Sequence, residues 1–255
     1  MNSSRCFSLA AFLVVLVLAS GAAGAVTISS GGAPNEAQVG QTVTSTFTLT
    51  ELYQNPNYQQ WTLQGQTDLA NVTWTVQTLN QAGEVVDTQS YNGGRFNHQI
   101  SIENDVAEVR VKITGEVPEI TNYSYSPQEQ FLFAGFIQVR QGGTSNQINV
   151  YQTHHFTPDS KKARQAIRSA QRAIQQAGGN QEAQTIVDNA ISAYEAGNFQ
   201  NAIDLANQAR QRAEQAQQSQ QRTQLLLMAG GGILVVLLII GGIFWYRSQQ
   251  TGSKL

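Results

Sequence analysis

The pattern of apolar and polar residues divides this 255-residue chain into four kinds of segment. An apolar run opens the chain, an alternating region follows, a helical pattern comes next, and a second apolar run lies near the end. Between residues 26 and 157 apolar and polar residues alternate with period two, which is typical of strands with one buried face. After residue 158 apolar residues recur at intervals of three and four, which predicts helices.

The alternating region predicts a β-domain over residues 26–157. Glycine-containing segments separate its apolar stretches and predict turns, since glycine adopts positive φ without strain. Several short strands at intervals of about ten residues are typical of an antiparallel sandwich of two sheets. Trp74 falls within one stretch and is the predicted core tryptophan. The expected strands cover residues 39–49, 72–79, 84–87, 99–102, 107–113, 130–139 and 147–151.

The helical region, residues 158–223, is predicted to form an antiparallel helical hairpin or three-helix bundle. Proline followed by capping residues, from Pro158 to Ser160, predicts the start of the first helix. Residues 178–180 (GGN) and 197–198 (GN) predict two helix ends, and such short connections favour antiparallel packing. Small and apolar residues recur along one face of each helix, which allows the helices to approach closely.

The first apolar run, residues 9–19, follows Arg5 and precedes a series of small residues. That order predicts a secretory signal peptide over residues 1–25. An uncleaved anchor is the alternative, and either version would export the residues that follow. The only cysteine of the chain, Cys6, precedes this run, so the β-domain must be held by its core without a disulfide.

The second apolar run is about 22 residues long without a charge, or roughly 33 Å of helix, which matches the thickness of a bilayer core. Trp245 and Tyr246 lie at one end of this run, where aromatic rings favour the membrane interface. A buried core helix is the alternative. The pattern predicts a transmembrane helix over residues 224–246 and a cytoplasmic tail over residues 247–255.

Together these segments predict an α+β multidomain chain. Its expected parts are an all-β sandwich, a helical hairpin or three-helix bundle that holds the sandwich away from the membrane, and one transmembrane helix. The expected location is the cell membrane, with a single crossing and the sandwich outside.

Several stretches resemble known modules. Residues 39–43 (VGQTV), 71–76 (NVTWTV), 83–86 (GEVV) and 109–115 (VRVKITG) resemble strands of immunoglobulin-like modules on prokaryotic surfaces. Residues 193–203 (AYEAGNFQNAI) resemble the turn between the helices of a tetratricopeptide repeat, but a repeat array needs several stacked units. The whole layout is similar to uncharacterised archaeal-type single-pass surface proteins. This resemblance implies an immunoglobulin-like fold and supplies no established activity.

Composition and charge exclude one class of partner. The formal net charge is −2, and charged residues make up 13% of the chain. Binding to nucleic acid depends on neutralising phosphates, and no basic patch in the sequence is large enough for that. We therefore expect no nucleic-acid partner.

The residue types that carry chemistry are few. His154 and His155 are adjacent in an expected strand and would point to opposite faces, so they are poor partners in one metal site. We expect these two histidines and His98 to be ordinary residues of the sandwich. Glu103 and Asp105 could offer oxygen ligands to calcium, although they also fit a polar turn. Neither nucleophile nor phosphate-binding motifs are present. We predict no catalytic, cofactor-binding or metal-binding residues and no enzymatic activity.

Two short motifs predict modification sites. Asn71-Val72-Thr73 and Asn122-Tyr123-Ser124 fit the acceptor pattern for N-glycosylation, at Asn71 and Asn122. Chance matches are the alternative in a chain rich in asparagine and threonine.

These patterns predict a protein that acts by contact with other molecules. A membrane-anchored extracellular module would bind another surface or membrane protein, a glycan or a cell-envelope component, or serve a structural role. The alternatives are an accessory subunit of a membrane complex that docks a partner through the helices, and an exported enzyme.

Overall fold

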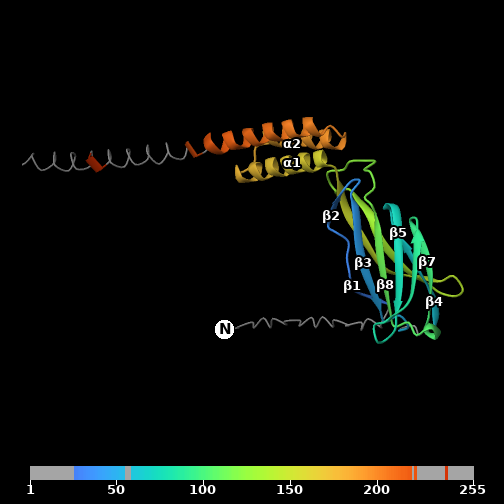
Figure 1. Cartoon of the computed structure of the whole chain (residues 1–255). Helices are drawn as coiled ribbons and strands as arrows, with labels where there is room; N and C mark the ends of the chain where they lie inside the picture. The colour runs from blue at the N-terminus through green and yellow to red at the C-terminus, as the bar shows by residue number, and fades with distance from the viewer. Residues whose placement is uncertain (1–25, 55–58, 220, 223–238, 241–255) are drawn as a thin grey trace, which may run out of the picture.

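The computed structural model describes residues 26–54, 59–219, 221–222 and 239–240 (Figure 1). The first helix and the second lie side by side at one end of a unit made of two sheets. The strands are β1 (Thr27–Ser30), β2 (Glu36–Gln38), β3 (Thr42–Thr50), β4 (Gln60–Gln66), β5 (Ala70–Leu79), β6 (Val85–Asn92), β7 (Arg95–Ser101), β8 (Glu108–Glu116), β9 (Gln130–Val139) and β10 (Ser145–Phe156). The helices are a 3-10 turn (Ile102–Asn104), α1 (Pro158–Gln176), α2 (Gln181–Glu195) and a third helix covering residues 199–219.

Each sheet has five strands, in the orders β1-β3-β8-β5-β6 and β2-β10-β9-β4-β7. Neighbouring strands are antiparallel except for β2 and β10, which run parallel where Glu36–Gln38 pairs with residues 154–156. The four edge strands are therefore β1, β6, β2 and β7. This arrangement leaves β6 and β7, joined by a short turn, as edges of different sheets on the same side of the unit.

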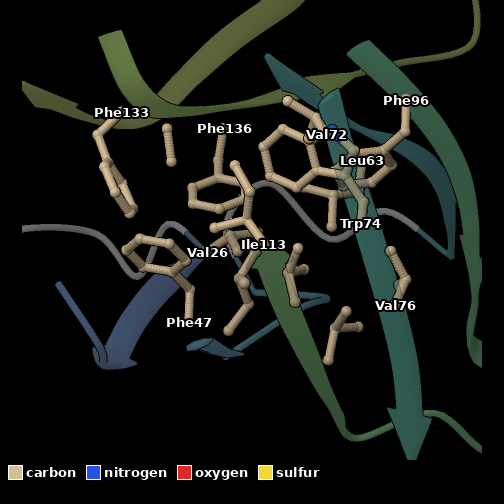
Figure 2. Packing of buried hydrophobic residues seen from close by; sticks show 14 of the residues in the cluster. Val26, Phe47, Leu63, Val72, Trp74, Val76, Phe96, Ile113, Phe133 and Phe136 are labelled. Atoms are coloured by element: carbon tan, nitrogen blue, oxygen red, sulfur yellow. The ribbon is translucent and has the colours of Figure 1, made fainter. Parts of the chain in front are cut away.

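The two sheets pack face to face on one apolar core (Figure 2). Inward residues alternate with outward ones along the strands, because successive side chains of a strand point to opposite faces. The ring of Phe47 from one sheet meets that of Phe136 from the other edge-on, with centroids 5.1 Å apart. Trp74 is fully buried and its ring lies 4.9 Å from that of Phe96, so the predicted core tryptophan is confirmed.

The helices begin where side chains satisfy their free backbone N–H groups. The Thr157 hydroxyl accepts a hydrogen bond from the Ser160 N–H, and the Ser160 hydroxyl accepts one from the Thr157 N–H. Asn180 caps α2, since its side-chain oxygen accepts a hydrogen bond from the Ala183 N–H. Small residues from all three helices form a second apolar cluster, which includes Ala163, Ile167, Ala170, Val187, Ala190, Ala202, Ala206, Ala209 and Ala213.

The predicted fold class is wrong as it stands. None of the helices in the described part of the chain is long and apolar enough to cross a membrane. The structure instead has two mostly antiparallel five-stranded sheets, with a parallel β2–β10 pair, and three helices between residues 158 and 219. The physical reason is that these helices are amphipathic: one face is buried against the other helices and the opposite face is polar.

The same finding corrects two further predictions: the location at the cell membrane with a single crossing, and the description of the chain as a transmembrane protein. The signal peptide over residues 1–25 and the tail over residues 247–255 lie outside the described residues. So does the predicted span over residues 224–246, apart from residues 239–240.

Candidate functional site

The loop between β8 and β9 is the place where the two-sheet unit meets the helices. Tyr123 of this loop packs edge-on against Phe199 and Tyr194, with ring centroids 4.7 and 6.1 Å away. Tyr125 packs against Tyr194 in the same manner at 5.9 Å, and its hydroxyl donates to Gln171 on α1 at 2.8 Å. One loop of the sheets therefore contacts all three helices. We call this region the junction.

A buried ion pair lies at the centre of the junction. Arg164 of α1 and Glu129, the residue directly before β9, are joined by an Nη2–Oε2 contact of 2.9 Å, and their side chains are only 8% and 4% exposed. The Tyr194 hydroxyl of α2 accepts from Arg164 Nη2 at 3.0 Å and donates to Glu129 Oε1 at 3.0 Å. The Ser124 N–H also donates to Glu129 Oε1. The carboxylate is therefore held by a charge and two hydrogen bonds.

The guanidinium of Arg164 has further partners. It donates to the backbone carbonyls of Tyr125 and Ser124, each at 2.7 Å, and lies over the rings of Tyr125 and Tyr194 at 4.9 and 4.8 Å. Burying two charges is costly unless both are hydrogen-bonded, and this pair meets that condition. Burial raises the pKa of Tyr194 to about 12, so its hydroxyl keeps the proton that it donates to Glu129. The network fixes the helices to the sheets.

A pocket of about 230 Å³ opens beside the junction, between α1 and the paired ends of β2 and β10. Lys161 of α1 makes an ion pair of 2.5 Å with Glu36 of β2 and lies 4.1 Å from the centre of the Phe156 ring. Arg168, about one turn further along α1 than Arg164, lines the pocket as well. The walls of the pocket thus carry more positive than negative charge.

Strand β6 is a second candidate site, because it is an edge strand whose side chains are exposed on both faces. Seven of its eight residues are exposed, and Tyr91 is half-buried. Val85 and Val86 are exposed by 52% and 48%, which is unusual for large apolar side chains. A strand edge also presents N–H and C=O groups that point away from the sheet. Strand β6 can therefore accept another strand.

A polar cluster lies where β6 faces β7. Because Tyr91 pairs with the core residue Trp74, the side chains of Asp87, Gln89 and Tyr91 lie on the inner face of their sheet. The Tyr91 hydroxyl donates to Gln89 Oε1 at 2.6 Å and lies 3.0 Å from His98 Nδ1 on β7. Burial lowers the pKa of His98 below 6.5, and the Asp87 carboxylate opposes that shift.

We expect His98 to titrate below pH 6.5 in the folded protein, and the change Asp87→Asn to lower its pKa further, because the opposing carboxylate is lost. The unfolded chain therefore binds a proton on this histidine at a higher pH than the folded protein does. Because protonation favours the unfolded chain, His98 makes the protein less stable as pH falls below 6.5. NMR titration of the imidazole signals measures both pKa values, and the protein in concentrated urea is the control. A midpoint at or above the unfolded value, or an upward shift in the variant, would contradict this expectation.

The structure separates the three histidines and places the two acids in a turn. His154 Nδ1 lies 3.1 Å from the Glu129 carbonyl, and His155 Nδ1 lies 3.2 Å from the Pro118 carbonyl. Both histidines therefore contact the backbone of the loop between β8 and β9. Glu103 belongs to the 3-10 turn, which Asp105 closes in the left-handed conformation. Within the described residues no group of three or more histidine, cysteine, aspartate or glutamate side chains could hold a metal ion.

Both predicted glycosylation sites are exposed. Asn71, the second residue of β5, has a positive φ of 51°, and its amide donates to Glu116 Oε2 at 2.9 Å. Asn122 lies in the junction loop, directly before Tyr123 and Ser124. Glycosylation of either residue stays a prediction.

Sequence reasoning missed the residues at the centre of the junction: Arg164, Glu129 and Tyr194. One signal was available, since Arg164 lies between Ala163 and Ile167 on the apolar face of its helix. A charge in that position implies a buried partner, but the pattern does not reveal which carboxylate.

Comparisons with known proteins assign no family. No family model matches the chain, and no curated protein matches it either. The solved structures that match include Spo0M, a sporulation control protein from Bacillus subtilis, with a TM-score of 0.31 and 11% identity over 57% of this chain. The chain spans 55% of that protein's length. A likeness this weak defines neither a family nor a function, and the resemblance to archaeal-type surface proteins stays a prediction.

Proposed function

We propose that this chain is a binding module that acts by contact with another protein, and that β6 is the strand through which it binds. The observation that carries this proposal is the exposure of β6 on both faces at a sheet edge. The proposal involves no catalytic step.

The four edge strands differ in their capacity to accept a partner. β1 and β2 have four and three residues, and β7 has seven but buries alternate side chains in the core. β6 has eight residues and contains neither proline nor lysine, the residues that most often block pairing at an edge. An irregularity in register near Val85 affects only the end of the strand, which leaves Asp87–Asn92 in regular pairing with β5.

The chemistry of this edge favours a protein ligand over a glycan. An extended peptide that adds to a sheet gains a row of backbone hydrogen bonds, and apolar side chains at the edge give it anchoring points. Val85 and Val86 would supply those points next to the β5–β6 turn. The preferred partner segment is therefore extended and carries apolar side chains at one end.

The junction supports this role by making the module rigid. Because Arg164 and Glu129 link the helices to the sheets through buried groups, a partner bound at β6 would be held in a defined orientation relative to α1. The alternative is an accessory subunit that docks a partner through the helices. It is supported by a shallow hollow along the exposed face of α1, lined by Gln165, Arg168, Gln171, Arg172 and Gln175.

Site-specific photo-crosslinking tests the proposal. A photoreactive amino acid at Thr88, in the exposed middle of β6, is expected to form a covalent adduct with one partner protein in the native cells. The same group at Lys112, exposed on the outer face of the central strand β8, is the matched control and should give none. The change Val86→Lys should abolish the adduct, because a lysine at an edge opposes strand addition.

Equal adducts at Thr88 and Lys112, or an adduct that persists in the Val86→Lys variant, would rule out β6 as the binding edge. Adducts at Gln175 but not at Thr88 would favour docking through the helices. An adduct with the mass of two copies of this chain would show self-association at β6 instead of binding to a different protein.

A further inference from the structure

One face of α1 carries a row of basic and amide side chains that the sequence pattern did not single out. Lys161, Gln165, Arg168 and Arg172 follow one another at intervals of four, three and four residues, so they lie on the same side of the helix. Two hollows open along this row and share Gln165 and Arg168 in their walls. The first is the junction pocket, and the second is a shallower hollow of about 510 Å³.

Positive charge along this row is only partly neutralised. The walls of the two hollows contain four cations, Lys161, Arg164, Arg168 and Arg172, and one carboxylate, Glu36. Glu36 pairs with Lys161, and the buried Glu129 pairs with Arg164. These pairs leave Arg168 and Arg172 as the source of a net positive charge on an exposed helix face.

The two remaining arginines have weak or uncharged partners. Arg168 Nη2 lies 3.4 Å from Gln128 Oε1, and Arg172 Nε lies 3.4 Å from the Arg168 carbonyl. In the part of the chain that the structure describes, neither forms an ion pair with a carboxylate. Guanidinium groups match carboxylates in a planar, two-pronged geometry. Each arginine can thus accept a carboxylate from outside the chain.

We propose that this row binds an acidic peptide segment of a partner protein. From Lys161 to Arg172 the helix rises by about 16 Å, which corresponds to about five residues of extended peptide. Arg168 and Arg172 would bind two carboxylates, while the amides of Gln165, Gln171 and Gln175 offer donors and acceptors for peptide groups. Because this surface lies on α1, it is independent of strand addition at β6.

A peptide explains the features better than a small anion does. A single phosphate or sulfate would occupy only part of one hollow, whereas the two hollows are neighbours that share Gln165 and Arg168 in their walls. The alternating charged and amide residues suit a ligand that alternates carboxylates and backbone amides. An acidic glycan would also present carboxylates, but its hydroxyl-rich backbone lacks those amides.

Fluorescence anisotropy with a labelled hexaglutamate peptide and the full-length protein at low salt tests the proposal. We expect hexaglutamate to bind and hexaglutamine not to bind. Replacing both arginines, Arg168→Gln and Arg172→Gln, should weaken binding at least about fivefold, the loss expected for two exposed charge pairs. The double variant Arg110→Gln, Lys112→Gln on the outer face of β8 removes the same charge and should bind like the wild type.

Three results would overturn the proposal: equal binding of hexaglutamine, equal loss of affinity in both double variants, or tighter binding of a hexameric oligogalacturonate than of hexaglutamate. Arg168 and Arg172 are exposed, so circular dichroism should show both variants folded. Arg172→Gln alone is a second variant, which should weaken binding by about half as much on a logarithmic scale. The Val86→Lys variant should bind hexaglutamate normally, which keeps this test separate from that of β6.

Discussion

Replacing Arg164 with leucine is expected to lower the free energy of unfolding by about 3–5 kcal/mol, the usual cost of breaking a buried ion pair. The change leaves Glu129, whose side chain is 4% exposed, without its cation. It also removes the donors to the carbonyls of Ser124 and Tyr125 and to the Tyr194 hydroxyl. Glu129 would keep only its hydrogen bonds from Ser124 and Tyr194.

Urea denaturation with two probes measures this effect. Far-UV circular dichroism at 222 nm follows the helices, and tryptophan fluorescence, recorded in a Trp245→Phe background, reports on Trp61 and Trp74 in the core of the two-sheet unit. If the junction is the main link, the dichroism transition should move to lower urea more than the fluorescence transition does. A variant whose two transitions both match those of the wild type would contradict the role of the ion pair.

A double variant separates the lost pair from the lost packing. Replacing Arg164 and Glu129 together by leucine removes both charges and leaves apolar side chains in their place. Such exchanges are often neutral, so most of the lost stability should return. If the double variant is as unstable as Arg164→Leu, the cost arises from the carbonyl groups that lose their donors and not from the unpaired carboxylate. Lys112→Leu, at an exposed position that forms no ion pair within the described residues, is the control and should change stability by less than about 0.5 kcal/mol.

Alternation along the chain was a good guide to four of the longer strands and a poor guide to the shortest ones. Of β10, the longest strand, only residues 147–151 were predicted. β3, β5, β8 and β9 fall within a few residues of the predicted ranges, since each buries one face in the core. β1 and β2, with four and three residues, were missed because the backbone of their neighbours, and not their own pattern, selects them.

β4 was missed for a different reason. Gly65 takes an inward position of this strand, where an apolar side chain would have completed the alternation of Trp61 and Leu63. The Phe96 ring fills that space: a Cβ added to Gly65 would lie 2.0 Å from its nearest atom. Gly65 therefore marks the close approach of the Phe96 side chain to the strand. From the sequence alone, such a glycine cannot be distinguished from a glycine in a turn.

The junction could not be predicted because its members lie far apart in the chain. Glu129 and Arg164 are separated by 35 residues, and each belongs to a different kind of structure. Their pairing depends on where β9 begins relative to α1, which only the folded chain determines. The edge at β6 was equally hidden. The strands over residues 72–79 and 84–87 were predicted, but the order of strands in the sheet, which makes β6 an edge, was not.

Replacing Trp74 with alanine should lower the free energy of unfolding by about 3–5 kcal/mol, the typical cost of removing a fully buried aromatic side chain. Trp74 is 0% exposed and its ring packs against Phe96 and Phe136. Its indole N–H also donates to the Gly93 carbonyl at 2.9 Å, in the turn between β6 and β7. Since the only cysteine is Cys6, no disulfide bond within the chain can offset this loss.

The conservative change Trp74→Phe separates the apolar contacts from the hydrogen bond. Phenylalanine keeps much of the packing but leaves the carbonyl of the exposed Gly93 without its indole donor, so about 0.5–1.5 kcal/mol should be lost with that hydrogen bond. Far-UV circular dichroism in urea measures both variants, and Val85→Ala, at a position that is 52% exposed, is the control. A loss below about 1 kcal/mol for Trp74→Ala would contradict a tightly packed core. If Trp74→Phe also weakens crosslinking at Thr88, the Gly93 hydrogen bond positions β6 for its partner.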